Sequence, residues 1–225
     1  MQELLNVITL NGNELWGIIA MSITVSGTAV VLGALAGIPM GTWLGLRDFP
    51  AKRMVMRLVF TLMALPPVLA GLVVYLLLSR SGPLGSMEWL FTPQAMISAQ
   101  FLLVTPIIAG LTASAVASRE RVVHDLARSL GATSFQAGLT VLRESRTAII
   151  SAILTGFGRA FAEVGAVMLV GGNIRYDTRV LTTSIVMETR AGNYAFAIAL
   201  GLILLLISFI VSSVALRLAD ELQAE

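Results

Sequence analysis

Five long apolar stretches constrain this chain more than any other feature of its sequence. A helix needs about 20 mostly apolar residues to cross a membrane. Only 12% of the residues are charged, about half the share that is usual in soluble domains. We therefore expect an all-α, polytopic membrane protein that forms one domain over residues 1–225. Its five transmembrane helices should lie at roughly Trp16–Leu46, Leu58–Ser79, Ala95–Ala117, Thr147–Val170 and Tyr194–Leu216.

The basic residues between these stretches predict an orientation. Arg47, Lys52, Arg53, Arg57, Arg119, Arg121, Arg128, Arg143, Arg146 and Arg217 fall on one side, whereas only Arg80, Arg175, Arg179 and Arg190 fall on the other. Lysine and arginine are enriched in cytoplasmic loops. The side with ten basic residues should therefore be cytoplasmic. The N-terminus, with Glu3 and Glu14 and no basic residue, should lie outside, and the C-terminus inside.

Several classes of site are missing from the sequence. The chain has no cysteine and a single histidine, His124, so no disulfide framework or metal cluster is expected. It has no Gly-x-x-x-x-Gly-Lys-Ser/Thr motif for nucleotide phosphates. The sequence contains no recognisable nucleophile–base pair that would indicate an intramembrane enzyme. The net charge of +2 gives no reason to expect a nucleic-acid partner. We expect no catalytic residue, metal or cofactor in this chain.

Glycines and prolines mark the apolar stretches. Gly33, Gly37, Gly41 and Gly45 recur every four residues, which places them on one ridge of a helix where a second helix can approach closely. Pro39 should kink that helix. Pro66 and Pro106 lie near the middle of the next two stretches. Either they make ordinary packing kinks, or their helices line a gated pathway.

A polar but patterned segment, at about residues 118–146, separates the third and fourth stretches. Val122, Leu126 and Leu130 share one helical face. Gly131 suits a helix C-terminus, and Thr133 with Gln136 fits a capping box. The pattern predicts a helix, a glycine turn and a second helix at the cytoplasmic surface. Its apolar residues should insert either into the protein's own helices or into a cytoplasmic partner.

This segment carries a resemblance to a known family. "DLARSLGATSFQAGLTVL", residues 125–142, resembles the cytoplasmic loop of ABC-importer permeases, whose motif is Glu-Ala-Ala, three residues, Gly, nine residues, then Ile-x-Leu-Pro. Arg143 and Glu144 depart from it by replacing Leu-Pro. The resemblance implies that the segment couples to a separate ATPase subunit. The residues it assigns to that role are Asp125, Leu126, Ala127, Leu130, Gly131 and Val141.

A second stretch, "GRAFAEVGAVMLVGGNI", resembles oxyanion permeases and is most similar to tungstate permeases, since molybdate relatives have Gly-Glu-Phe-Gly-Ala at this place. The resemblance implies a type I ABC-importer permease fold in a bacterial or archaeal cytoplasmic membrane. It also implies a homodimer, two copies of an ATPase that uses ATP and Mg, and an extracytoplasmic solute-binding protein. The cargo should be tungstate. The alternatives are molybdate, sulfate, or an ATP-independent anion transporter.

Arg159 and Glu163 lie four residues apart in the fourth apolar stretch. A charged side chain there costs about 2.5–3.5 kcal/mol on insertion scales and usually faces a bundle interior or water. On one helix the two would share a face. They either neutralise each other or lie at a subunit interface or along the pathway. Together with Gly165, Pro66 and Pro106, they are the candidates for the pathway or gate.

The segment after that stretch, residues 171–193, is basic. Arg175, Arg179 and Arg190 are either solvated charges or a surface for the binding protein or an incoming dianion. Since the resemblance implies a binding protein, these arginines are the candidates for docking it on the outer side.

Overall fold

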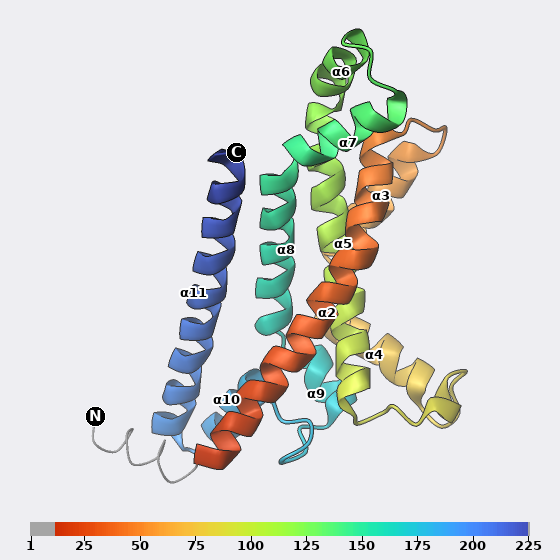
Figure 1. Ribbon diagram of the computed structural model, residues 1–225. Helices are drawn as coiled ribbons and strands as arrows, with labels where there is room; N and C mark the ends of the chain where they lie inside the picture. Colours follow the sequence, from red (N-terminus) through yellow and green to blue (C-terminus); the bar gives the residue numbers. More distant parts are fainter. Residues whose placement is uncertain (1–11, 225) are drawn as a thin grey trace. The chain divides into compact units, whose positions relative to one another are not determined.

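Every regular element in the described part of the chain is helical (Figure 1). The computed structural model describes residues 12–224, so Glu3 lies outside the described residues. The helices are α2 (Gly12–Leu46), α3 (Lys52–Met63), α4 (Pro67–Leu78), η1 (Gly85–Met87), α5 (Pro93–Arg119), η2 (Glu120–His124), α6 (Asp125–Ser129), α7 (Ser134–Glu144), α8 (Arg146–Phe161), α9 (Gly165–Gly171), α10 (Leu181–Arg190) and α11 (Tyr194–Ala224).

Three of the helices, α2, α5 and α11, are long and apolar enough to cross a membrane as single rods. The other two predicted spans are each interrupted. The helices α3 and α4 meet at an angle of 97°, and α8 and α9 meet at 57°. The chain has five candidate spans if each bent pair counts as one. The positions of the apolar stretches were therefore predicted well, but not the continuity of the second and fourth.

Two adjacent prolines cause the first interruption. Pro66 is extended, with φ −60° and ψ 128°, and Pro67 is the first residue of α4. Proline lacks an N–H for the helical ladder and pushes the preceding residue out of the helical region, whereas it is well suited to the first helical position. A lone proline has a smaller effect here, because α2 continues through Pro39 and α5 continues through Pro106.

The chain divides into two compact units, each assembled from three separate stretches. One comprises residues 12–29, 66–102 and 158–211, and the other comprises 30–65, 103–157 and 212–224. Because each unit draws on all parts of the chain, neither matches a contiguous sequence domain. The two units are described separately below.

The glycine ridge of α2 packs directly on α5 within the second unit. A Cβ atom added at Gly33 would lie 3.0 Å from the Val104 side chain, and one at Gly37 would lie 3.1 Å from the Ala109 backbone nitrogen. At Gly41 it would collide with the Ala109 carbonyl oxygen. The prediction that a second helix approaches this ridge is confirmed, and that helix is α5.

In the first unit, α4 packs on α9. A Cβ atom at Gly71 would lie 2.7 Å from the Ala166 Cα, and one at Gly165 would lie 2.9 Å from the Val68 side chain. Gly165 is therefore used for contact inside the chain. This packing positions the short α9 and the non-helical residues before it, where the buried Glu163 lies.

Candidate functional site

The fourth predicted span is broken at Glu163. Helix α8 ends at Phe161 and α9 begins at Gly165, so Arg159 and Glu163 do not share one continuous helix, and the i,i+4 geometry expected for them is absent. Glu163 is only 4% exposed. Its Oε1 accepts a hydrogen bond of 2.9 Å from the backbone N–H of Ala166. The carboxylate thus satisfies a donor at the start of α9 instead of pairing with Arg159.

Polar side chains from three other helices bond to two carbonyl oxygens at the break, and that of Ala160 also accepts from the Glu163 N–H at 3.1 Å. Gln100 of α5 donates from Nε2 to the Ala160 carbonyl oxygen at 3.0 Å. The Ser26 hydroxyl of α2 reaches the same oxygen at 3.5 Å. Thr182 of α10 donates to the Glu163 carbonyl oxygen at 2.7 Å. Unpaired carbonyl groups are costly inside a membrane, so these side chains stabilise the break.

Sequence reasoning missed these polar partners. Ser26 and Gln100 lie inside apolar stretches, and both are buried, as is Thr182. The Oε1 atom of Gln100 is buried and has no hydrogen-bond partner among the described residues. A buried glutamine in a membrane helix is itself a signal, and it was present in the sequence. The carbonyl oxygen to which this glutamine donates could not be predicted from the sequence.

Arg159 remains without a polar partner in the part of the chain that the structure describes, and its side chain is partly exposed. The alternative in which Arg159 and Glu163 neutralise each other is therefore not observed in this structure. Of the other pathway candidates, Pro66 lies at the first break and Pro106 inside α5. Nearby, Gly158 has open space around its Cα, whereas Gly156 packs on the side chains of Val104 and Ile108.

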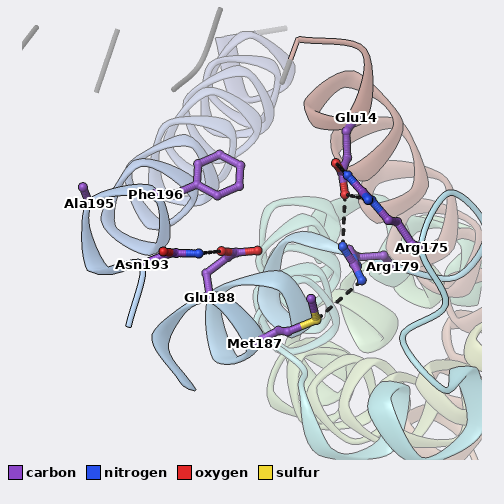
Figure 2. A pocket seen from close by; sticks show the side chains of 8 residues that line it. All are labelled: Glu14, Arg175, Arg179, Met187, Glu188, Asn193, Ala195 and Phe196. Atoms are coloured by element: carbon purple, nitrogen blue, oxygen red, sulfur yellow. Dashed lines mark hydrogen bonds and ion pairs between the residues drawn. The ribbon is translucent and has the colours of Figure 1, made fainter. Parts of the chain in front are cut away.

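A second polar site is the arginine cluster, which we define as Glu14, Arg175 and Arg179 (Figure 2). Arg175 donates from Nε and Nη2 to the two carboxylate oxygens of Glu14, at 2.9 and 2.6 Å. Arg179 donates from Nη1 to Glu14 Oε1 at 3.0 Å. One carboxylate at the start of α2 thus engages two arginines of the segment between α9 and α10. The carboxylate raises the pKa of the Arg175 guanidinium, mainly through its hydrogen bond.

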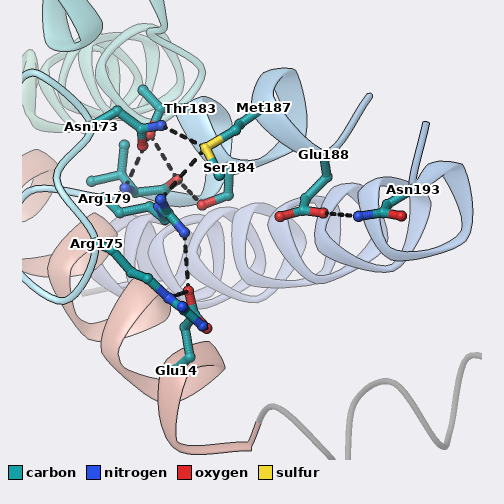
Figure 3. A network of polar contacts seen from close by, with 10 residues as sticks. Glu14, Asn173, Arg175, Arg179, Thr183, Ser184, Met187, Glu188 and Asn193 are labelled. Carbon is teal, nitrogen blue, oxygen red and sulfur yellow. Dashed lines mark hydrogen bonds and ion pairs between the residues drawn. The ribbon is translucent and has the colours of Figure 1, made fainter. Parts of the chain in front are cut away.

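The segment that carries these arginines is held in place by further contacts (Figure 3). Asn173 Nδ2 and Arg179 Nη2 both point at the Met187 sulfur, at 3.3 and 3.5 Å. Thr178 is buried and bonds to the Gly171 carbonyl oxygen. Arg175 also lies over the Tyr176 ring, 4.9 Å from its centroid. The backbone is therefore fixed on both sides of the arginines.

The structure separates the three arginines that the sequence grouped. Arg175 and Arg179 are engaged by Glu14, while Arg190 is exposed at the end of α10 and outside the cluster. A cavity of about 520 Å³ adjoins the cluster. Its lining consists of Glu14, Arg175, Arg179, Met187, Glu188, Asn193, Ala195 and Phe196. No sequence pattern pointed to Glu14, more than 160 positions away, as the partner.

The segment at residues 118–146 folds as predicted into two helices around a glycine turn. Gly131 has φ +90°, a conformation that residues with a Cβ rarely adopt. The Thr133 hydroxyl accepts from the Gln136 N–H, and the Gln136 side chain accepts from the Thr133 N–H at 2.8 Å. Arg128 closes the turn by donating to the Ala132 carbonyl oxygen at 2.6 Å. The capping-box prediction is confirmed in both of its hydrogen bonds.

The apolar face of this segment is not covered by the described chain. Val122, Leu126 and Leu130 are 60–81% exposed, as is Phe135 at the start of α7. These side chains therefore do not insert into the protein's own helices in this structure. Val141, by contrast, is fully buried, so its side chain packs inside the protein. The sequence did not predict the π-helix η2, whose wider turn precedes α6.

Comparisons with known proteins agree with this architecture. Residues 37–222 match the family model for the binding-protein-dependent transport system inner membrane component. The chain is 45% identical over 208 residues to the tungstate uptake system permease protein TupB of Peptoclostridium acidaminophilum, covering 92% of this chain and 91% of the relative. It is 45% identical over 217 residues to a probable anion ABC transporter permease of Haloferax volcanii, covering 94% of each.

A more distant relative and a solved structure are also similar to this chain. The molybdenum transport system permease protein ModB of Azotobacter vinelandii is 25% identical over 201 residues, covering 86% of this chain and 89% of the relative. A chain in the crystal structure of a bacterial ABC transporter, described as importing alginate, superposes with a TM-score of 0.71 at 18% identity. That superposition covers 92% of this chain and 79% of the other. At that identity, the likeness concerns the fold alone.

Proposed function

Because the chain belongs to the family of binding-protein-dependent transport system inner membrane components, we propose that its cargo is tungstate. It is the permease subunit of an ABC importer and leaves ATP hydrolysis to a separate subunit. The observation that carries the cargo assignment is the 45% identity to a tungstate uptake permease over nearly the whole of both chains.

The proposal includes an assembly and an orientation. One permease domain per chain pairs with a second copy of itself, two ATPase subunits that use ATP and Mg, and an extracytoplasmic binding protein. The segment around Gly131 faces the cytoplasm, and the arginine cluster faces the outside. The exposed apolar side chains before and after the glycine turn support the proposal that this segment inserts into the ATPase.

We assign Arg159 and the break at Glu163 to the pathway or to the interface between the two copies. An arginine without a polar partner in its own described chain favours a partner outside it, either water in a pathway or the second subunit. Glu163 contributes through the break itself, because its carboxylate and carbonyl oxygen both hold the non-helical residues in place.

The cargo is tested by reconstituting the permease with its ATPase and binding protein in liposomes. We expect uptake of radiolabelled tungstate that requires ATP and persists in the presence of excess sulfate. Preferential uptake of molybdate or sulfate would replace tungstate by that anion. Uptake that proceeds without ATP and without the ATPase subunit would instead favour the ATP-independent transporter.

The orientation is tested by labelling single cysteines, since the chain has no native cysteine. Tyr176→Cys and Ser129→Cys place the thiol at exposed positions on the two proposed sides. Thr178 is unsuitable because it is buried. A membrane-impermeant reagent should label position 176 from outside and position 129 only after the membrane is opened. The reverse pattern would invert the topology.

A further inference from the structure

Arg179 is a largely enclosed arginine, and much of the hydrogen-bonding capacity of its guanidinium is unused. Its side chain is only 11% exposed. Nη1 has a carboxylate acceptor, Nη2 faces only the Met187 sulfur, and the buried Nε has no partner among the described residues. A thioether is a weak acceptor, and leaving buried donors unpaired is costly. An arginine in this state is suited to a ligand with several anionic oxygens.

A cavity that could hold such a ligand lies beside Arg179. The cavity of about 520 Å³ is lined by both arginines of the cluster, and Figure 2 shows them converging on Glu14 at its wall. Glu14 offers two oxygens to three N–H donors of the arginines. Planar guanidinium groups bind carboxylates and tetrahedral oxyanions through the same forked contacts. The carboxylate therefore holds the position that an oxyanion would take.

We propose that Arg175 and Arg179 form a transient binding site for a tetrahedral dianion, and that the Glu14 carboxylate is its internal competitor. This inference rests on the proposed function and orientation, which supply the anion and bring it to this side. An incoming dianion displaces Glu14 from the arginines, and Glu14 returns when the anion moves on. Because each arginine always keeps an anionic partner, either Glu14 or the dianion, the anion can be released without leaving an uncompensated charge behind.

The charges around the cavity set the strength of the site. Glu188 also lines it, with its carboxylate held by the Asn193 amide at 2.8 Å. Two arginines and two glutamates cancel, so the site attracts a dianion weakly while Glu14 is in place. Weak binding suits a transporter, which must let its cargo leave. It also predicts strong sensitivity to salt, since Arg175 is more than half exposed.

The test is equilibrium dialysis of radiolabelled tungstate against the permease alone in nanodiscs at low ionic strength. Without the ATPase and the binding protein, the measurement is independent of transport. We expect weak binding by the wild type, and loss of binding in Arg179→Gln. Glu14→Gln should bind about fivefold more tightly, because an ion-pair contribution near 1 kcal/mol corresponds to a factor of that order.

Two controls match these changes in charge elsewhere on the same proposed side. Arg80→Gln and Glu88→Gln alter exposed residues outside the cluster, so tungstate binding should stay within twofold of the wild type. Should Glu14→Gln fail to fold, Arg175→Gln provides the second variant, and it should weaken binding. Sulfate and molybdate, dialysed in parallel, should show the same order of variants even if tungstate is not the cargo.

A purely structural ion cluster predicts a different result. In that case Glu14→Gln and Arg179→Gln would lower the thermal stability of the permease while tungstate binding stayed at the wild-type level in both. That result would overturn the inference, as would equal changes in binding for the cluster variants and their controls. Neither result would bear on ATP-driven uptake, which the liposome experiment measures separately.

Discussion

The glycine turn at Gly131 and the break at Glu163 both interrupt a helix, but they are specified in different ways. At the turn, the hydrogen bonds between described residues are local, and they include Arg128 to Ala132 and Thr133 to Gln136. At the break, side chains from α2 and α5 bond to the Ala160 carbonyl oxygen, and one from α10 bonds to the Glu163 carbonyl oxygen. The first is encoded by a local motif and the second by tertiary contacts.

The difference follows from the surroundings of each interruption. The turn has exposed residues on both sides, where water can satisfy any backbone group that the motif leaves open. The break is buried, and in an apolar medium each free carbonyl needs a protein donor. A change at the break should therefore cost global stability, whereas a change at the turn should cost only local order.

The largest effect is expected for Gln100→Leu. It removes one buried donor to the Ala160 carbonyl oxygen, which keeps the Glu163 N–H as a donor, and should lower the free energy of unfolding by about 2 kcal/mol. Chemical denaturation in mixed micelles measures this. Gln94→Leu, at an exposed position in the first turn of the same helix, is the control and should change little. Equal losses in both variants would mean that the break does not depend on this donor.

Thr182→Val should have the next largest effect. It keeps the shape of the side chain and removes the donor to the Glu163 carbonyl oxygen, at a cost of about 1–2 kcal/mol in the free energy of unfolding. Thr189→Val removes a hydroxyl from the exposed face of the same helix and should be nearly neutral. Denaturation by the same method ranks the two, and a ranking in the opposite order would argue against bracing by Thr182.

Gly131→Ala should lower the local stability of the turn by about 1 kcal/mol through backbone strain alone. No atom lies within 4 Å of the added Cβ, but φ is +90°, where a side chain is unfavourable. Gly158→Ala also has open space, without a positive φ, and should be neutral or slightly stabilising. Hydrogen exchange should speed up only in α6 and α7 of the first variant. Faster exchange throughout the protein would mean that the turn is coupled to the whole fold.

The smallest effect is expected for Thr133→Ala, which removes the capping box at the start of α7. Loss of such a cap costs about 0.5–1 kcal/mol, so the first turn of α7 should fray, with faster amide exchange there and an unchanged midpoint of global unfolding. Thr140→Ala, in the middle of the same helix, serves as the control. A shift of the global midpoint would contradict the contrast between the two interruptions.

The same contrast explains how far the sequence could be interpreted. The five apolar stretches, the glycine ridge and the capping box are patterns of a few neighbouring residues, and the structure bears them out. The break was missed because residues 162–164 contain neither glycine nor proline. The partners of Glu14 and Glu163 were missed because spacing along one helix says nothing about donors supplied by distant segments.

The contact between α2 and α5 has a mechanical consequence. Gly37 and Gly41 lie directly against the backbone of α5, and Gly33 lies against the Val104 side chain, so little space is left at this contact for a rearrangement. Sliding one helix along the other would bring larger residues into these gaps until the next glycine arrived, four residues or about 6 Å further along. The pair therefore behaves as a stiff strut with no small intermediate steps, and any smaller displacement during transport has to be absorbed in other parts of the chain.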